Sequence, residues 1–163
     1  MTDITALRQP PTDRFEIFTP DFDAIVAEGD AAMKGWLPPR SGMRRFAAPA
    51  DRSMRSGFSV FGPNVSGKVS YWMKEVWYVI EGSATLEIED LVTGTATSHR
   101  VAAGDAVYFP EAVRLNLITG GERLVLFYSA TPASGRDAPW IAALGQFDID
   151  DARKRLAYES GAD

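Results

Sequence analysis

The chain of 163 residues is 45% hydrophobic and 24% charged, which suits one domain large enough to bury a self-supporting core. It has no cysteine, so disulfides, thiolate metal sites and cysteine nucleophiles are excluded. A formal net charge of −5 disfavours nucleic acid and anionic membranes as partners, and no stretch approaches the ~18 apolar residues that a membrane span needs, so we expect a cytoplasmic protein.

The first 53 residues form a predicted N-terminal arm. After Thr19 and Pro20, apolar residues recur at helical spacing, which predicts a short helix over 20–33. Thr19 is the expected capping residue, and we expect the apolar face of the helix to pack on the rest of the domain.

Basic residues cluster at the end of this arm, at Arg44, Arg45, Arg52 and Arg55. A cluster of this kind can meet an anionic ligand, but most are solvated. We interpret these arginines as protein surface.

Residues 54–131 are typical of an antiparallel β domain. Short runs rich in Val, Tyr, Phe, Trp and Ile are separated by Gly, Pro, Asn and Asp, and no helical pattern lies between them. The runs predict strands at 57–61, 68–80, 84–90, 95–102, 106–109, 113–119 and 122–130. A C-terminal extension, 132–163, is predicted to carry a helix over 149–159. The expected fold class is all-β with minor α.

The segment Gly62-Pro-Asn-Val-Ser-Gly-Lys68 fits the first seven places of a phosphate-binding P-loop. Val69 stands where that motif needs a Ser or Thr for Mg²⁺, and an apolar strand follows where it needs the start of a helix. We therefore interpret the segment as a hairpin turn.

Two motifs in the β region carry a family resemblance. Glu75-Val-Trp-Tyr-Val-Ile-Glu-Gly82 matches the second half of the first cupin motif, and Gly104-Asp-Ala-Val-Tyr-Phe-Pro110 matches the opening of the second. Glycines at 82 and 104 also suit turns with positive φ. The chain thus resembles the cupin superfamily and is loosely similar to its ethanolamine-utilisation Q-type branch. The resemblance implies a cupin-type antiparallel β-barrel, or jelly roll, over residues 54–131.

The departures from the cupin motifs concern the metal site. Cupins supply two His and a Glu from the first motif and a third His from the second. Alignment on Glu75 puts Val69 and Tyr71 at the first two His places, and Leu115, five residues after Pro110, stands at the third. Since one carboxylate with a phenol is a poor metal site, we expect neither metal nor other cofactor. The alternative is an unusual metal site that recruits Glu75, His99 and an acidic side chain.

The candidate site lies on the strand that carries Glu75. Strand alternation puts Val69, Tyr71, Met73, Glu75 and Trp77 on one face, and the resemblance places that face inside the barrel. We predict Glu75 as a catalytic acid or base whose pKa is raised by desolvation, with Tyr71 as a hydrogen-bond donor to the substrate. Substrate-binding residues are then Trp77, Met73, Val69 and Leu115, an apolar wall that favours hydrophobic substrates. The alternative is that these side chains are core, and that Glu75 only accepts a structural hydrogen bond.

The functional hypothesis is a small-molecule-binding cupin that works as a metal-independent isomerase or lyase on a small organic acid or aromatic compound. The alternative is a non-catalytic metabolite-binding or assembly cupin of a catabolic pathway. Outward aromatic residues, Trp72 and Tyr78, together with analogy to similar barrels, predict a homodimer.

Overall fold

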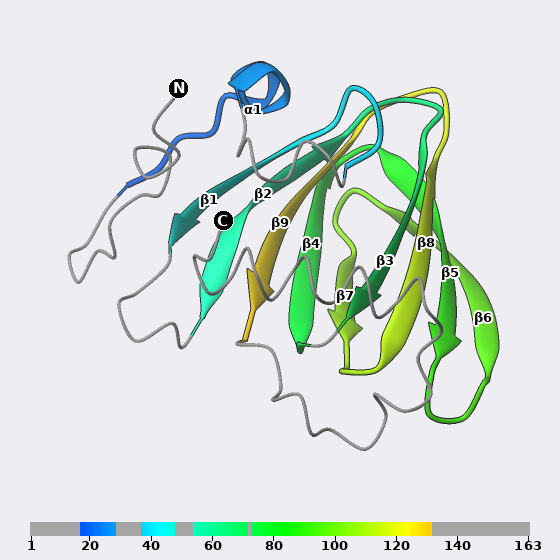
Figure 1. The fold of residues 1–163 in the computed structure, drawn as a ribbon. Helices are drawn as coiled ribbons and strands as arrows, with labels where there is room; N and C mark the ends of the chain where they lie inside the picture. Colours follow the sequence, from blue (N-terminus) through cyan, green and yellow to red (C-terminus); the bar gives the residue numbers. More distant parts are fainter. Residues whose placement is uncertain (1–16, 29–36, 48–53, 72, 132–163) are drawn as a thin grey trace, which may run out of the picture.

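A computed structural model describes residues 17–28, 37–47, 54–71 and 73–131. In these ranges the chain forms one short helix and nine strands, which make two antiparallel sheets (Figure 1). The first sheet has the order β1-β2-β9-β4-β7 and the second the order β3-β8-β5-β6. The bounds are α1 (Phe22–Glu28), β1 (Gly42–Ala47), β2 (Arg55–Phe61), β3 (Ser66–Tyr71), β4 (Glu75–Glu81), β5 (Ser83–Asp90), β6 (Ala96–Ala102), β7 (Ala106–Phe109), β8 (Val113–Thr119) and β9 (Leu124–Ala130).

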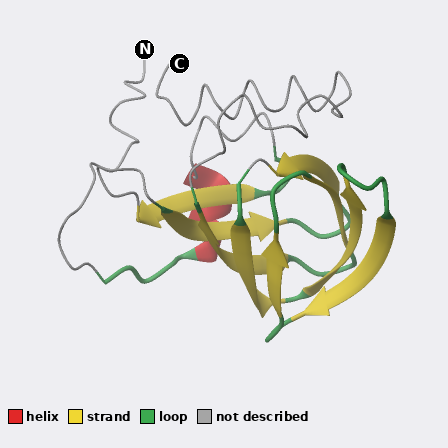
Figure 2. Ribbon diagram, turned by 90° about the horizontal axis from the view of Figure 1, so that it is seen from below, coloured by secondary structure: helices red, strands yellow, loops and turns green. Residues whose placement is uncertain are grey.

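The two sheets face each other and enclose one apolar core (Figure 2). The alternation within β8 shows why: Val113, Leu115 and Leu117 are buried, whereas the residues between them are only partly buried. In β9, Leu124 and Leu126 turn to the same core, and Val125 turns to the outer face. A strand with one apolar face thus decides which side of each sheet becomes interior. This arrangement confirms the predicted all-β barrel.

Six of the predicted strands are confirmed to within two residues at each end, but the strand predicted over 68–80 is wrong. It is two strands in different sheets, β3 and β4, joined by a corner near Lys74. At the corner the Lys74 amide donates to Thr131 Oγ1 (3.2 Å), and the Thr131 amide donates to the Lys74 carbonyl (3.0 Å). Tyr71 and Met73 are both buried, so the inward alternation continues through the corner. A sequence period of two cannot show that a chain changes sheet.

The predicted N-terminal arm contributes a strand of its own. β1 pairs antiparallel with β2, from Gly42 opposite Val60 to Arg45 opposite Gly57, with a register shift before Ala47. Two adjacent arginines, Arg44 and Arg45, interrupt the apolar residues of this segment, so it has no clear strand pattern in the sequence. The remaining limits of the predicted arm and extension stay predictions, and the helix predicted over 149–159 lies outside the described residues.

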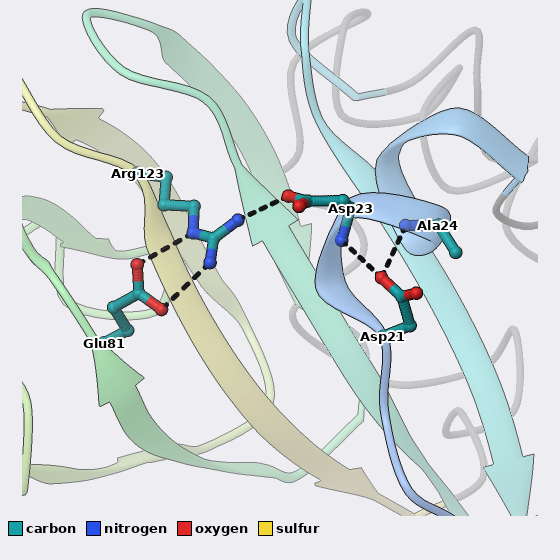
Figure 3. Close-up of polar contacts among 5 residues, drawn as sticks. All are labelled: Asp21, Asp23, Ala24, Glu81 and Arg123. Carbon is teal, nitrogen blue, oxygen red and sulfur yellow. Dashed lines mark hydrogen bonds and ion pairs between the residues drawn. The ribbon is translucent and has the colours of Figure 1, made fainter.

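Helix α1 begins two residues later than predicted, because Asp21 rather than Thr19 caps it. Asp21 Oδ1 accepts hydrogen bonds from the amides of Asp23 (3.1 Å) and Ala24 (3.0 Å) (Figure 3). Amides in the first turn of a helix have no backbone acceptor within the helix, so the side chain supplies one. The helix ends at Glu28 in the described part of the chain, and the rest of the predicted helix lies outside it.

One arginine ties α1 to the barrel. Arg123 donates to both carboxylate oxygens of Glu81 (2.8 and 3.2 Å) and to Asp23 Oδ1 (2.7 Å) (Figure 3). The hydrogen bond from Arg123 lowers the pKa of Glu81 below its usual value. Behind this contact Ile25 packs on Val60 and Val125, so the helix covers the outer face of the first sheet.

The turns between strands are partly as predicted. Gly82 and Gly104 have φ of 79° and 95°, as the motifs suggested. The segment that resembles a P-loop does lead into a strand, but it is not a hairpin turn, because β2 and β3 belong to different sheets. The buried Thr119 hydroxyl accepts from the Val65 amide (3.0 Å) and donates to the Gly62 carbonyl (2.7 Å), which holds this crossing in place.

Candidate functional site

Glu75 begins β4 at the end of the barrel that is lower in Figure 1. It stands opposite Phe109 of β7 and Ala130 of β9, and residues directly opposite each other share a face of a sheet. Both neighbours are buried, so this face is the interior, and Glu75 itself is partly buried. The side chain therefore points inward from the rim of the barrel.

A neighbouring indole orients the Glu75 carboxylate. Trp77 lies two residues further along the strand on the same face, and its Nε1 donates to Glu75 Oε1 at 2.5 Å. Trp77 is only 3% exposed, so its ring has little freedom to move. A donor fixed by packing holds the carboxylate in one direction.

Aromatic rings from both sheets meet beside this carboxylate. Tyr71 of β3 stacks on Phe109 of β7, with ring centroids 4.8 Å apart and planes 4° apart. Trp77 meets Phe109 edge-on at 4.7 Å and Tyr71 at 6.3 Å. The stack brings Tyr71, from the second sheet, to the same end of the interior as Glu75. Phe109 was not among the predicted site residues, although its place next to Pro110 in the second motif could have suggested it.

Two of the positions that hold metal ligands in cupins come together. Val69 lies directly opposite Leu115 across β3 and β8, and both turn inward. Neither side chain has a donor atom, and Leu115 is completely buried. Residues at these places do not fit a metal ion.

The alternative metal site receives no support from the described ranges. His99 is exposed on β6, which is an edge strand of the second sheet. Among the described residues, no three His, Asp or Glu side chains lie close enough to share a metal ion.

The interpretation of the basic cluster as surface is wrong for two of its arginines. Arg44 points outward and donates to the Glu28 carbonyl at the end of α1 (3.0 Å). Arg45 and Arg55 instead lie on the inward face, and Arg55 Nη2 is 2.9 Å from the sulfur of the buried Met73. Arg52 lies outside the described residues. Counting back in twos from the inward positions of β1 and β2 would have found both arginines, had β1 been recognised as a strand.

The outer face of β4 and β7 is apolar and exposed. Tyr78 is 50% exposed and Tyr108 is 58% exposed, and Val76 lies directly opposite Tyr108. Ile80 continues the same face. Tyr78 is thus outward as predicted, whereas Trp72 lies outside the described residues.

Comparisons with known proteins were made by family models, by sequence and by structure. No family model matches the chain, and no curated protein matches it. A Cupin 2 conserved barrel domain protein from Salinispora arenicola superposes with a TM-score of 0.52 and 19% identity, over 80% of this chain and 95% of that one. A structure of the DMSP lyases RdDddP and RnDddQII superposes with a TM-score of 0.50 and 18% identity, over 58% of this chain and 48% of that one. The putative ethanolamine utilization protein Q of Salmonella typhimurium superposes with a TM-score of 0.46 and 23% identity, over 58% of this chain and 71% of that one. The first of these likenesses, which covers 80% of this chain and 95% of the other, shows the fold.

Within the described ranges, the structure holds no helix that is both apolar enough and long enough to cross a bilayer.

Proposed function

Because the chain has the cupin fold, we propose that it binds a small molecule inside the barrel and transfers a proton on it without a metal ion, as an isomerase or lyase. The observation that carries this proposal is the Glu75 carboxylate, which faces inward at the barrel rim and is oriented by the buried indole of Trp77. The proposed substrate is a small organic acid or an aromatic compound. Lyase chemistry is named for one protein of this fold, the DMSP lyases, but a fold alone does not fix a reaction.

In the proposed reaction the ionised Glu75 removes a proton from carbon. The C–H bond breaks, an O–H bond forms on Glu75, and the electron pair moves into a new double bond. In an isomerase Glu75 returns the proton to another carbon of the same molecule. In a lyase a leaving group departs with its bonding electrons, and Glu75 then loses the proton to water.

The other predicted site residues have positioning roles in this proposal. Tyr71 donates a hydrogen bond to the substrate, and its ring is held in place by the stack on Phe109. Trp77, Met73, Val69 and Leu115 provide the apolar wall, and all four turn to the interior. Apolar walls with a few placed polar groups are typical of small-molecule sites.

Exchange of substrate protons with solvent provides a test that works even when the product is unidentified. The protein is incubated in D₂O with a panel of small aliphatic and aromatic acids, and loss of C–H signals is followed by proton NMR. We expect one or more compounds to exchange or react, and Glu75→Gln to abolish this. The matched control is Glu87→Gln, which alters an exposed carboxylate on β5. Full activity of Glu75→Gln would remove Glu75 from the mechanism, and a panel without exchange or reaction would favour the non-catalytic function.

The second candidate function is a non-catalytic metabolite-binding or assembly protein, which the apolar outer face of β4 and β7 favours. We infer that this face, with Val76, Tyr78, Ile80 and Tyr108, pairs with a second copy of the chain. β7 is an edge strand of the first sheet, so two copies can meet there across a two-fold axis. Tyr78→Lys with Tyr108→Lys should turn the dimer into a monomer in sedimentation velocity. A wild-type monomer at high concentration would refute the dimer.

A further inference from the structure

Arg45 lies in a row of inward residues that crosses the first sheet. It stands opposite Gly57, which stands opposite Tyr128, which stands opposite Trp77. Tyr128 and Trp77 belong to the buried core, so Arg45 shares its face with them. The Nε atom of Arg45 is itself buried. This guanidinium therefore leaves the sheet toward the barrel interior and not toward solvent.

Arg55 lies in the neighbouring row, which contains Glu75. Arg55 and Glu75 both stand opposite Ala130, one on each side of β9, so their backbones are about 10 Å apart, or two strand spacings. The Arg55 side chain extends along this row, because its Nη2 reaches the sulfur of Met73, which precedes Glu75 by two residues. The guanidinium therefore lies at the same rim of the barrel as the carboxylate.

The smallest residues of the two rows stand beside the arginines. Ala130 separates Arg55 from Glu75, and Gly57 separates Arg45 from Tyr128. A methyl group on Gly57 would lie 2.7 Å from the Tyr128 hydroxyl, so the Tyr128 ring lies over the space that a larger residue would fill. At Gly57 this space is taken by the Tyr128 ring, and at Ala130 only a methyl group stands between the Arg55 and Glu75 positions.

Arg45 and Arg55 bring two positive charges to the inward face of the first sheet. Arg55 lies on the adjacent strand, two residues before Gly57, which is the partner of Arg45, and the register shift of β1 follows Arg45. The described inward residues of the first sheet provide two guanidinium charges and one carboxylate at this end, Glu75. A partly buried pair of arginines beside aromatic rings is suited to a planar anion, since each guanidinium can donate two parallel hydrogen bonds.

We propose that Arg45 and Arg55 bind the carboxylate of the ligand, so that the site takes an organic monocarboxylate with an apolar or aromatic remainder. This deepens the proposed function, on which it rests for the location of the site beside Glu75. The remainder of the ligand packs on Tyr71 and Trp77, and its carboxylate adds a negative charge between the two guanidinium groups. The apolar wall selects the body of the ligand, and the arginines select its charge.

The test compares acids with their own amides in binding to the full chain. Benzoate, phenylacetate, 3-phenylpropionate and crotonate, each with its primary amide, are titrated by calorimetry at low salt. We expect at least one acid to bind at least tenfold more tightly than its amide. Arg55→Gln and Arg45→Gln should each weaken that acid by about tenfold to hundredfold, which is the loss expected for a hydrogen-bonded charge. Arg55→Lys, which keeps the charge and loses the planar fork, should have an intermediate effect. If Arg45→Gln does not fold, the two Arg55 variants decide the question.

Two control variants separate this site from net charge. Arg44→Gln changes the outward neighbour of Arg45, and Arg100→Gln changes an exposed arginine of β6. Both should leave the affinity for the acid within twofold. Equal loss in these controls, equal binding of acids and amides, or no binding of any acid would overturn the proposal. Inorganic phosphate that binds with the same arginine dependence and displaces the acids would overturn the assignment to carboxylates.

The two proposals can fail separately. If acids bind through the arginines but no compound exchanges its protons, the anion site stands and catalysis does not. If neutral compounds react and Arg55→Gln changes neither turnover nor binding, catalysis stands and the anion site is refuted.

Discussion

Replacement of Gly82 by alanine tests the closest backbone contact at the upper end of the barrel. Gly82 has φ of 79°, and a Cβ on it would lie 2.0 Å from the Arg123 carbonyl oxygen and 3.0 Å from its carbonyl carbon. Neither atom can give way as a flexible side chain does, so the start of β9 must move. The left-handed conformation alone costs about 1 kcal/mol for alanine, and forced backbone movement adds about 1–3 kcal/mol. The displaced residue is also the one that binds Glu81 and Asp23.

A second glycine isolates the steric part of this effect. Gly94 has φ of 72°, and a Cβ on it would meet nothing within 4 Å. Gly94→Ala should therefore lower the free energy of unfolding by about 1 kcal/mol, and Gly82→Ala by about 2–4 kcal/mol. Urea unfolding of both variants at neutral pH, followed by circular dichroism, measures the difference. Equal destabilisation of the two variants would refute the close approach at Gly82.

Three further predictions concern the turn crossing, the ion pair and the lost metal positions. Thr119→Val removes a buried hydroxyl that both accepts and donates, and it should lower the free energy of unfolding by about 1–3 kcal/mol in urea; an unchanged midpoint would contradict the role of that hydroxyl. The lowered pKa of Glu81 contributes stability that is present above its unfolded value of 4.5 and is lost as the pH falls through the folded value. The free energy of unfolding of the wild type should thus exceed that of Arg123→Gln by up to about 1 kcal/mol at pH 6, and this difference should narrow below pH 4.5. Thermal melts of both proteins over a range of pH measure the difference, and a difference that does not depend on pH would contradict the prediction. The double variant Val69→His/Leu115→His places two imidazoles directly opposite each other on the inward face of the second sheet, and it should bind about one Co²⁺ per chain by calorimetry; a folded variant that binds none would show that these positions do not converge.

Local pattern was sufficient for most of the strands and for the inward face of β4. The period of two in β8 follows from burial on one side of a sheet, and it can be read without coordinates. The turns at Gly82 and Gly104 were equally visible, because few residues other than glycine accept positive φ. The site residues Glu75, Tyr71, Met73 and Trp77 were expected inside and lie there at least in part, although their roles remain proposals.

What could not be predicted depends on partners that are distant in the sequence. The stretch over 68–80 has one unbroken alternation, yet it serves two sheets, because the corner is set by hydrogen bonds to Thr131. Arg45 and Arg55 looked like surface, since a charged side chain is usually solvated, and only the pairing of β1 with β2 and of β2 with β9 showed that they turn inward. In the same way Asp21 became the cap of α1 where Thr19 was expected.

The sequence by itself determined that this protein is an antiparallel β domain with a carboxylate at Glu75 and without the histidines of a cupin metal site, because strand periodicity, turn residues and side-chain chemistry are local properties. Only the tertiary structure decided that two arginines share the interior with that carboxylate. Their direction is set by register across three strands, and register is a relation between segments up to 83 positions apart, from Arg45 to Tyr128.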